Sequence, residues 1–254
     1  QLVYRASVLD LMGESAGPSQ VSQAMVAIRG LRSEWRRLTR SEDGARKLVL
    51  ELCKPGQHAD LNLGMATPSQ CLLLLDLAMP MLRRMSVSDY WSMMRLCRRE
   101  VHRPEFIDIF HFLFTHVAGR RIAIGLGIRE PADVDSEDLG SVWGELHVLL
   151  SMMVQVSSPT HSARLMTYSD AWASLGVASD SVPEMATEVT LLQLMNALNR
   201  CEQASGSVRK LVLKAVGIAA TFNGLIQERD LVLMRLMADA MGMPLALPLR
   251  AHAG

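Results

Sequence analysis

Apolar residues recur with helical spacing along nearly the whole chain. Leu191, Met195 and Leu198 stand at positions i, i+4 and i+7, so they share one face of a helix. A second stripe of this kind consists of Trp91, Met94 and Val101. A third consists of Leu231, Met234, Met237, Ala238 and Met241. This period favours helices over strands, in which apolar residues would alternate.

The residue types that supply the apolar bulk support the same interpretation. Apolar residues make up 49% of the 254 residues, too many for a disordered chain, whereas aromatic residues make up only 5%. Leu, Ala and 17 Met residues dominate, and these are good helix formers. We therefore expect an all-α fold, a multi-helical array with helix faces rich in Met and Leu at its core.

Start and stop signals divide the pattern into about eleven helices. Ser86 followed by Asp89 is a capping box that predicts a helix beginning near Val87. Gly242 followed by Pro244 predicts the end of the last helix. The expected helices are 2–12, 20–39, 43–53, 69–84, 87–101, 106–120, 138–156, 160–175, 188–204, 207–222 and 226–241.

The longest candidate break, residues 121–136, predicts the domain organisation. We expect an N-terminal helical half over 1–120, a linker or long loop over 121–136, and a C-terminal helical half over 137–254. A buried strand at Ile122–Ile124 is an alternative for part of this segment.

A weak internal repeat relates the two halves. Residues 94–119 align with residues 213–238 at a constant offset of 119, and each copy reads as a helix, a break and a second helix. In this register Phe112-Leu113-Phe114 falls on Leu231-Val232-Leu233, and Val117 falls on Leu236.

Charge and cysteine usage restrict the partners and the compartment. The 26 basic and 26 acidic residues cancel, so we expect no nucleic-acid partner, and no uncharged apolar run is long enough to span a bilayer. Cys53, Cys71, Cys97 and Cys201 are far apart within apolar helical patterns, which favours buried free thiols in a reducing compartment. The chain begins at Gln1 without a signal peptide, which suggests that an N-terminal part is missing.

No catalytic motif emerges from the sequence. The helical His-Glu-x-x-His signature of zinc peptidases is absent, and His111 and His116 lie about 140° apart around a helix. No phosphate-binding loop or nucleophile elbow occurs, and Gly125-x-Gly127 lacks the third glycine of a dinucleotide site. We expect a non-catalytic chain; a hydrolase built on a helical fold is a minor alternative.

Several segments nevertheless resemble one family in the right order. Residues 74–86, LLDLAMPMLRRMS, resemble the run LLDLALPALRRLS in the C-terminal region of bacterial HtpX-like, CAAX-endoprotease-type metallopeptidases. Residues 44–52 and 106–112 resemble an upstream helix and the next element of that region. Residues 213–226 and 233–245 resemble its closing stretch.

The resemblance implies a role within a larger enzyme. In that family a zinc peptidase domain and membrane helices precede this region, so zinc is expected there and no cofactor here. The chain would be a non-catalytic accessory or regulatory module that binds a protein partner or the peptidase domain itself. It would be a soluble domain of a bacterial inner-membrane protein, on the cytoplasmic side.

The same segments resemble the helical repeats of tellurite-resistance TerB domains, whose acidic residues can bind metal. In the first copy Pro104 and Glu105 replace the Asp-Gly pair, and His111 replaces the Glu. The second copy has Asn223-Gly224, with Asp230 at the Glu position, so Asn223 and Asp230 are the candidate metal ligands. They are too few for a hard cation, and Asn-Gly is also a good turn, so we expect no metal site. A stand-alone TerB-like scaffold or stress-response protein is the alternative function.

Overall fold

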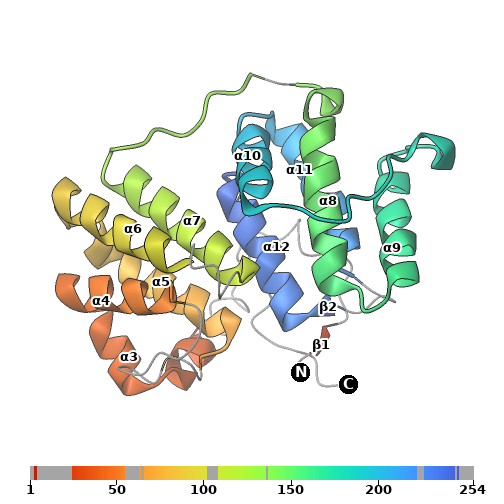
Figure 1. The fold of residues 1–254 in the computed structure, drawn as a ribbon. Helices are drawn as coiled ribbons and strands as arrows, with labels where there is room; N and C mark the ends of the chain where they lie inside the picture. The colour runs from red at the N-terminus through yellow and green to blue at the C-terminus, as the bar shows by residue number, and fades with distance from the viewer. Residues whose placement is uncertain are drawn as a thin grey trace. The chain divides into compact units, whose positions relative to one another are not determined.

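The computed structural model of the protein describes residues 3–4, 25–54, 63, 66–101, 108–135, 137–221, 226–243 and 245. It confirms the all-α fold class (Figure 1). The chain divides into two compact units. We call Pro18–Pro131 the N-terminal unit, and Ala132–Gly254 together with Gln1–Gly17 the C-terminal unit.

The N-terminal unit is a layered group of helices around a core of Leu, Met and Phe. Residues 25–30 are helical, and they are followed by α3 (Ser33–Leu38), α4 (Glu42–Leu52), α5 (Pro68–Leu82), α6 (Val87–Val101) and α7 (Ile109–Gly125). Helix α4 packs on α5, and α6 packs on α7. The side chains of Leu48, Leu75, Met93 and Phe114 are fully buried among these helices.

Local capping explains where several of these helices begin. The Ser86 hydroxyl oxygen accepts a hydrogen bond from the Asp89 amide at 3.1 Å, so α6 begins at Val87 as the capping box predicts. Thr67 and Gln70 form a reciprocal box at the start of α5.

The stripe that the sequence assigned to α6 is only partly buried. Met94 and Val101 lie in the core, but Trp91 is 45% exposed. Its neighbour Tyr90 is buried instead and donates a hydrogen bond to the Gly119 carbonyl at 3.2 Å. Tyr90, rather than the predicted Trp91, is therefore the aromatic residue of α6 that lies in the core.

Helix α7 continues into the segment predicted as a linker. It ends at Gly125, so residues 121–125 are helical and the strand alternative at Ile122–Ile124 is wrong. The physical reason is burial: Ile122 and Ala123 continue the apolar face of the helix into the core. Gly127, with φ of 68°, then ends the helix, and the N–H of Ile128 bonds to the Ala123 carbonyl.

The C-terminal unit surrounds one apolar helix, α8 (Trp143–Ser157), which follows the short turn η2 (Leu139–Val142). Helices α9 (His161–Ala173), α10 (Leu191–Glu202), α11 (Gly206–Ala219) and α12 (Glu228–Ala240) pack against α8, and η3 (Ser179–Ser181) precedes α10. Of the described residues, one helical stretch, Leu139–Ser157, is long and apolar enough to cross a membrane. The core helix of a globular unit meets the same criterion.

A two-stranded ladder also belongs to this unit. Strand β1 (Val3–Tyr4) pairs antiparallel with β2 (Ile226–Gln227), with Val3 opposite Gln227. The predicted helix over 2–12 is therefore wrong at residues 3–4, and the helix predicted from 226 begins at Glu228. Residues 2 and 5–12 lie outside the described part of the chain. The pairing joins residues more than two hundred positions apart, which periodicity within either segment does not reveal.

An extended strap connects η3 with α10 and runs beside α8 (Figure 1). Both main-chain polar groups of one strap residue, Ala186, are held: its N–H donates to the Ser151 hydroxyl at 3.2 Å, and its carbonyl accepts from the Gln155 amide at 2.6 Å. Ser151 and Gln155 are one turn apart on α8, so they hold the strap along the helix. Met185, buried beside this peptide, adds an apolar anchor.

The internal repeat has a structural counterpart. Helices α6 and α7 in one unit, and α11 and α12 in the other, are each a helix, a break and a second helix. Helix α7 begins at Ile109 and α12 begins at Glu228, which preserves the offset of 119. The aligned residues are buried in both copies: Phe112, Leu113, Phe114 and Val117, and Leu231, Val232, Leu233 and Leu236.

Candidate functional site

Of the two predicted metal-ligand candidates, Asp230 lies in the part of the chain that the structure describes. Asn223 lies outside the described residues. Asp230 occupies the first turn of α12 and is only 3% exposed. Burial raises the pKa of the Asp230 carboxyl to about 6, while the Ser157 hydroxyl and the charge of Arg229 act in the opposite direction. A single buried carboxyl offers a hard cation too few oxygen ligands and little access from solvent.

The histidines do not gather into a site in the described part of the chain. The Nδ1 atom of His111 lies 2.8 Å from an Asp108 carboxylate oxygen at the start of α7. In the other unit the Nδ1 atom of His147 lies 2.7 Å from the Tyr168 hydroxyl, and burial lowers the pKa of His147. Among the described residues, no three His, Cys, Asp or Glu side chains are grouped as a metal site would require.

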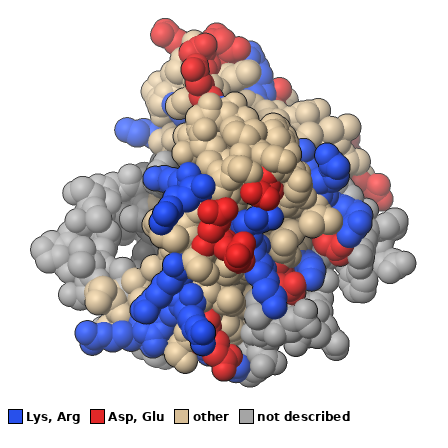
Figure 2. Space-filling view, turned by 90° about the vertical axis from the view of Figure 1, so that its left-hand side faces the viewer, with Lys and Arg blue, Asp and Glu red and all other residues tan. Residues whose placement is uncertain are grey.

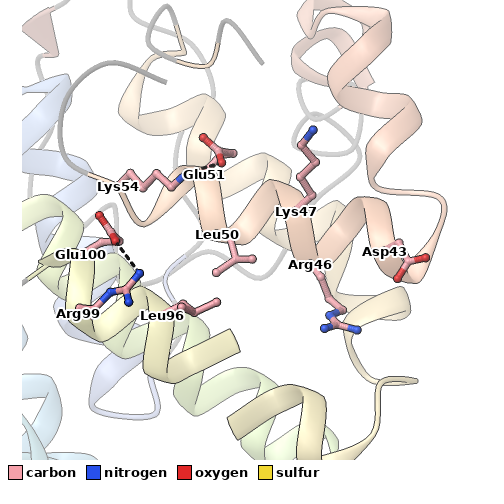
Figure 3. A pocket seen from close by; sticks show the side chains of 9 residues that line it. All are labelled: Asp43, Arg46, Lys47, Leu50, Glu51, Lys54, Leu96, Arg99 and Glu100. Carbon is pink, nitrogen blue, oxygen red and sulfur yellow. Dashed lines mark hydrogen bonds and ion pairs between the residues drawn. The ribbon is translucent and has the colours of Figure 1, made fainter. Parts of the chain in front are cut away.

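A surface groove lies between α4 and α6 of the N-terminal unit, with a volume of about 470 Å³ (Figure 3). Helix α4 contributes residues spaced at one helical face, and α6 contributes a second short stripe. The groove is lined by Asp43, Arg46, Lys47, Leu50, Glu51, Lys54, Leu96, Arg99 and Glu100.

The middle of the groove is apolar and its rims are charged. Leu50 from α4 and Leu96 from α6 point toward each other between the charged side chains (Figure 3). Leu96 is 39% exposed, and Leu50 is half-buried. The two leucines give the groove a small apolar centre between charged side chains.

The acidic groups along the groove are mostly neutralised from within. The Lys54 ammonium lies 2.5 Å from a Glu51 carboxylate oxygen, and Arg99 lies 3.5 Å from Glu100. Arg46 reaches out of the groove to Asp89 at 3.1 Å. Asp43 and Lys47, four residues apart on α4, are both exposed and form no ion pair with another described residue, so the rim carries one unpaired charge of each sign.

The neutrality of the whole chain conceals opposite charges on the two units. Residues 18–131 contain 17 Lys and Arg against 11 Asp and Glu, a formal charge of +6, so the remaining residues carry −6. Figure 2 shows Lys and Arg side chains spread over the face turned toward the viewer, with a smaller acidic group among them. Eight exposed cations of the N-terminal unit form no ion pair with another described residue. They are Arg29, Arg37, Arg40, Lys47, Arg83, Arg84, Arg95 and Arg98.

The described methionines lie mainly in the core. Ten Met side chains are buried, and Met25 and Met166 are the most exposed of those described. The groove instead has leucines at its centre. The sequence predicts a helix over 43–53, and only the packing of α6 beside it creates a groove. The one feature of this region that the sequence alone contains is the excess of Lys and Arg over Asp and Glu in residues 18–131.

In chemical terms, the groove offers an apolar contact between two charged rims, and it contains neither a nucleophile paired with a base nor a cluster of metal ligands. Such an arrangement suits non-covalent binding of an amphipathic segment. No family model matches the sequence, and no curated protein or solved structure matches it.

Proposed function

We propose that this protein is a non-catalytic protein-interaction module that receives a helix of a partner protein in the α4–α6 groove. The observation that carries the proposal is the exposed Leu96 beside Leu50, enclosed by charged rims. A hydrophobic groove between two helices can receive an amphipathic helix, whose apolar side chains repeat every three or four residues.

The resemblance of the sequence extends this proposal to the parent protein. In it the chain is the accessory C-terminal part of a bacterial, membrane-associated zinc metalloendopeptidase, on the cytoplasmic side, and the partner is the peptidase domain or one of its protein substrates. The four buried free cysteines are compatible with a reducing compartment. The alternative is a stand-alone TerB-like scaffold or stress-response protein.

Site-specific photo-crosslinking in the organism that encodes the protein tests the groove. A photoreactive residue replaces Leu96, which is 39% exposed, or Leu211 of α11, which is 40% exposed and serves as a matched control. We expect a discrete crosslinked protein at position 96 that is missing at position 211. Equal products at both positions would contradict docking in the groove.

Two further measurements test the metallopeptidase parent and the non-catalytic role of this chain. A reading frame that continues upstream of Gln1 into a His-Glu-x-x-His helix and hydrophobic spans would support the metallopeptidase, whereas a start codon near Gln1 would favour the stand-alone scaffold. Incubation of the purified chain with casein, with and without added zinc, should give no proteolysis. Zinc-dependent cleavage would show that the module itself is an enzyme.

A further inference from the structure

One face of α6 combines an exposed aromatic ring with positive charge. Trp91, Arg95 and Arg98 stand at positions i, i+4 and i+7, so they share this face of the helix. Trp91 is 45% exposed, and both arginines are exposed and form no ion pair with another described residue. Of the four Trp residues of the chain, only Trp91 is exposed. We call these three residues the Trp91 face.

The Trp91 face is separate from the α4–α6 groove. Because an α-helix has 3.6 residues per turn, Trp91 stands about 140° from Leu96 around α6. The two side chains therefore lie toward opposite edges of the exposed surface of this helix, and none of the three residues of the Trp91 face lines the groove. A ligand of this face goes beyond the proposed function.

The segment after α7 adds a further arginine beside this face. The rings of Tyr90 and Trp91 are in edge contact, with centroids 4.9 Å apart. Burial raises the pKa of the Tyr90 hydroxyl, and the positive charges of Arg98 and Arg129 lower it, so both guanidinium groups act on the same hydroxyl. Arg129 thus brings a positive charge from a second segment, although the exposed Glu130 that follows it offsets part of this charge.

Helix α6 itself contributes little negative charge. None of its exposed residues is acidic. Its two acidic residues are half-buried and paired: Asp89 lies 3.1 Å from Arg46 of α4, and Glu100 lies 3.5 Å from Arg99. The exposed surface of α6 is therefore cationic, in agreement with the formal charge of +6 on the N-terminal unit.

We propose that the Trp91 face of α6 binds single-stranded nucleic acid. The indole stacks on an unpaired base, and Arg95, Arg98 and Arg129 contact the neighbouring phosphates. Charge complementarity favours a polyanion, because arginines from two segments surround the ring in a unit that carries +6. The sequence-based expectation of no nucleic-acid partner followed from the charge of the whole chain, in which the other unit contributes −6.

The exposed indole favours a single strand over other polyanions. In a duplex the bases are paired and stacked on one another, so they offer the indole no free base. An anionic membrane binds a helix in proportion to the apolar area that becomes buried. Along this face only Trp91 and Val87, one turn earlier, are apolar and exposed, which is a small area for a membrane contact.

Fluorescence anisotropy with the full chain and a labelled DNA single strand of about 12 nucleotides tests the site. We expect binding that weakens about twentyfold when salt rises about fourfold from 50 mM, the dependence for three phosphate contacts. An abasic strand of the same length and charge should bind about tenfold more weakly, since it has no bases to stack. The strand with bases should also quench the fluorescence of the exposed Trp91.

Matched variants locate the contact. Trp91→Leu keeps an apolar side chain but removes the stacking surface, so we expect binding to weaken about tenfold and the quenching to disappear. Trp91→Phe should retain part of the binding, and Arg98→Gln should weaken it about threefold. Arg37→Gln removes an exposed arginine of α3, Leu96→Gln alters the groove, and both should change binding little. Far-ultraviolet circular dichroism establishes that each variant is folded.

Several outcomes would overturn the inference. They are no binding of the single strand, equal binding of the abasic strand or a duplex, and an effect of Arg37→Gln as large as that of Arg98→Gln. Loss of binding in Leu96→Gln would place the strand in the groove instead. Binding of phosphatidylserine vesicles in place of the strand, abolished by Trp91→Leu, would assign this face to a membrane surface. The crosslinking at position 96 does not depend on Trp91, so each of these failures leaves the proposed function to its own test.

Discussion

Tyr90 and Arg209 lie at equivalent positions of the two helical pairs, 119 residues apart, and each donates to a main-chain carbonyl within or directly after the second helix of its own pair. The Tyr90 hydroxyl donates to the Gly119 carbonyl at 3.2 Å, between α6 and α7. The Arg209 guanidinium donates to the Met241 carbonyl at 2.8 Å, between α11 and the C-terminal end of α12. Different side chains thus serve one purpose in both copies, the attachment of a helix to its successor.

Removal of these bonds should destabilise the unit that contains them. Tyr90→Phe keeps the buried ring but leaves the Gly119 carbonyl without this donor, so we expect a loss of about 1–2 kcal/mol in the free energy of unfolding. Arg209→Met keeps an apolar stem and should cost about 1 kcal/mol. Urea unfolding followed by circular dichroism measures both, with the exposed Ser92→Ala as a control. A Tyr90→Phe protein as stable as wild type would show that water replaces the bond.

Substitution of two helical glycines by alanine should change the stability of the protein in opposite directions. A Cβ on Gly44 would stand 2.4 Å from the Leu38 carbonyl oxygen, a backbone atom that cannot move aside cheaply. A Cβ on Gly144, in the first turn of α8, would meet nothing within 4 Å. We expect Gly44→Ala to lower the melting temperature, and Gly144→Ala to stabilise by about 0.5–1 kcal/mol through helix propensity. Stabilisation by Gly44→Ala would mean that α3 shifts away without cost.

The cysteines should resist thiol reagents until the protein unfolds. All four are buried. Contact with the Cys53 thiol and burial raise the pKa of Cys97, and burial raises the pKa of Cys201 to about 12. Because the thiolate is the reactive form, the reaction with Ellman's reagent at pH 8 should be at least a hundredfold slower in the native chain than in 6 M guanidinium chloride. Rapid modification of one native thiol would reveal a local opening that exposes it.

Asp230 should make stability depend on pH in an unusual direction. Its folded pKa, about 6, is raised above the ordinary value of 3.8, so the folded state binds the proton more tightly. The contribution of Asp230 to stability is therefore fully present below pH 4 and is lost as the pH rises toward 6 and above, by about 1–3 kcal/mol.

Asp230→Asn isolates this effect. The difference in unfolding free energy between Asp230→Asn and wild type should be near zero at pH 3.5 and favour the variant at pH 7.5. Asp180→Asn, at an exposed site in η3, is the control and should give a flat difference across this range. A variant that is less stable than wild type at pH 7.5 would indicate that the charged carboxylate stabilises the start of α12 more than burial penalises it.

Helix positions could be predicted because their signals are local. The Ser86–Asp89 capping box fixed the start of α6 at the predicted residue, and the buried stripe of α12 contains the five residues that periodicity selected. Errors arose where a distant segment decides the conformation. Val3–Tyr4 is a strand only because it pairs with Ile226–Gln227. Residues 121–125 are helical because the Ile122 side chain packs into the core.

The candidate groove could not be predicted in the same way. Its leucines belong to helices separated by the whole of α5, and neither Leu50 nor Leu96 differs from an ordinary surface leucine until the two helices are packed. The charge of the N-terminal unit was readable from the residues alone. It was missed because the sum was taken over the entire chain, where opposite contributions cancel.

That cancellation also has a consequence for how the protein behaves in solution. A chain with a formal charge of zero at pH 7 has no net repulsion to keep its copies apart. Each copy nevertheless presents a cationic unit and an anionic unit of equal magnitude, and these attract across molecules when few mobile ions separate them. Dilute buffer should therefore make the protein turbid at neutral pH, and moderate sodium chloride should dissolve it again, the salting-in behaviour of a zwitterion.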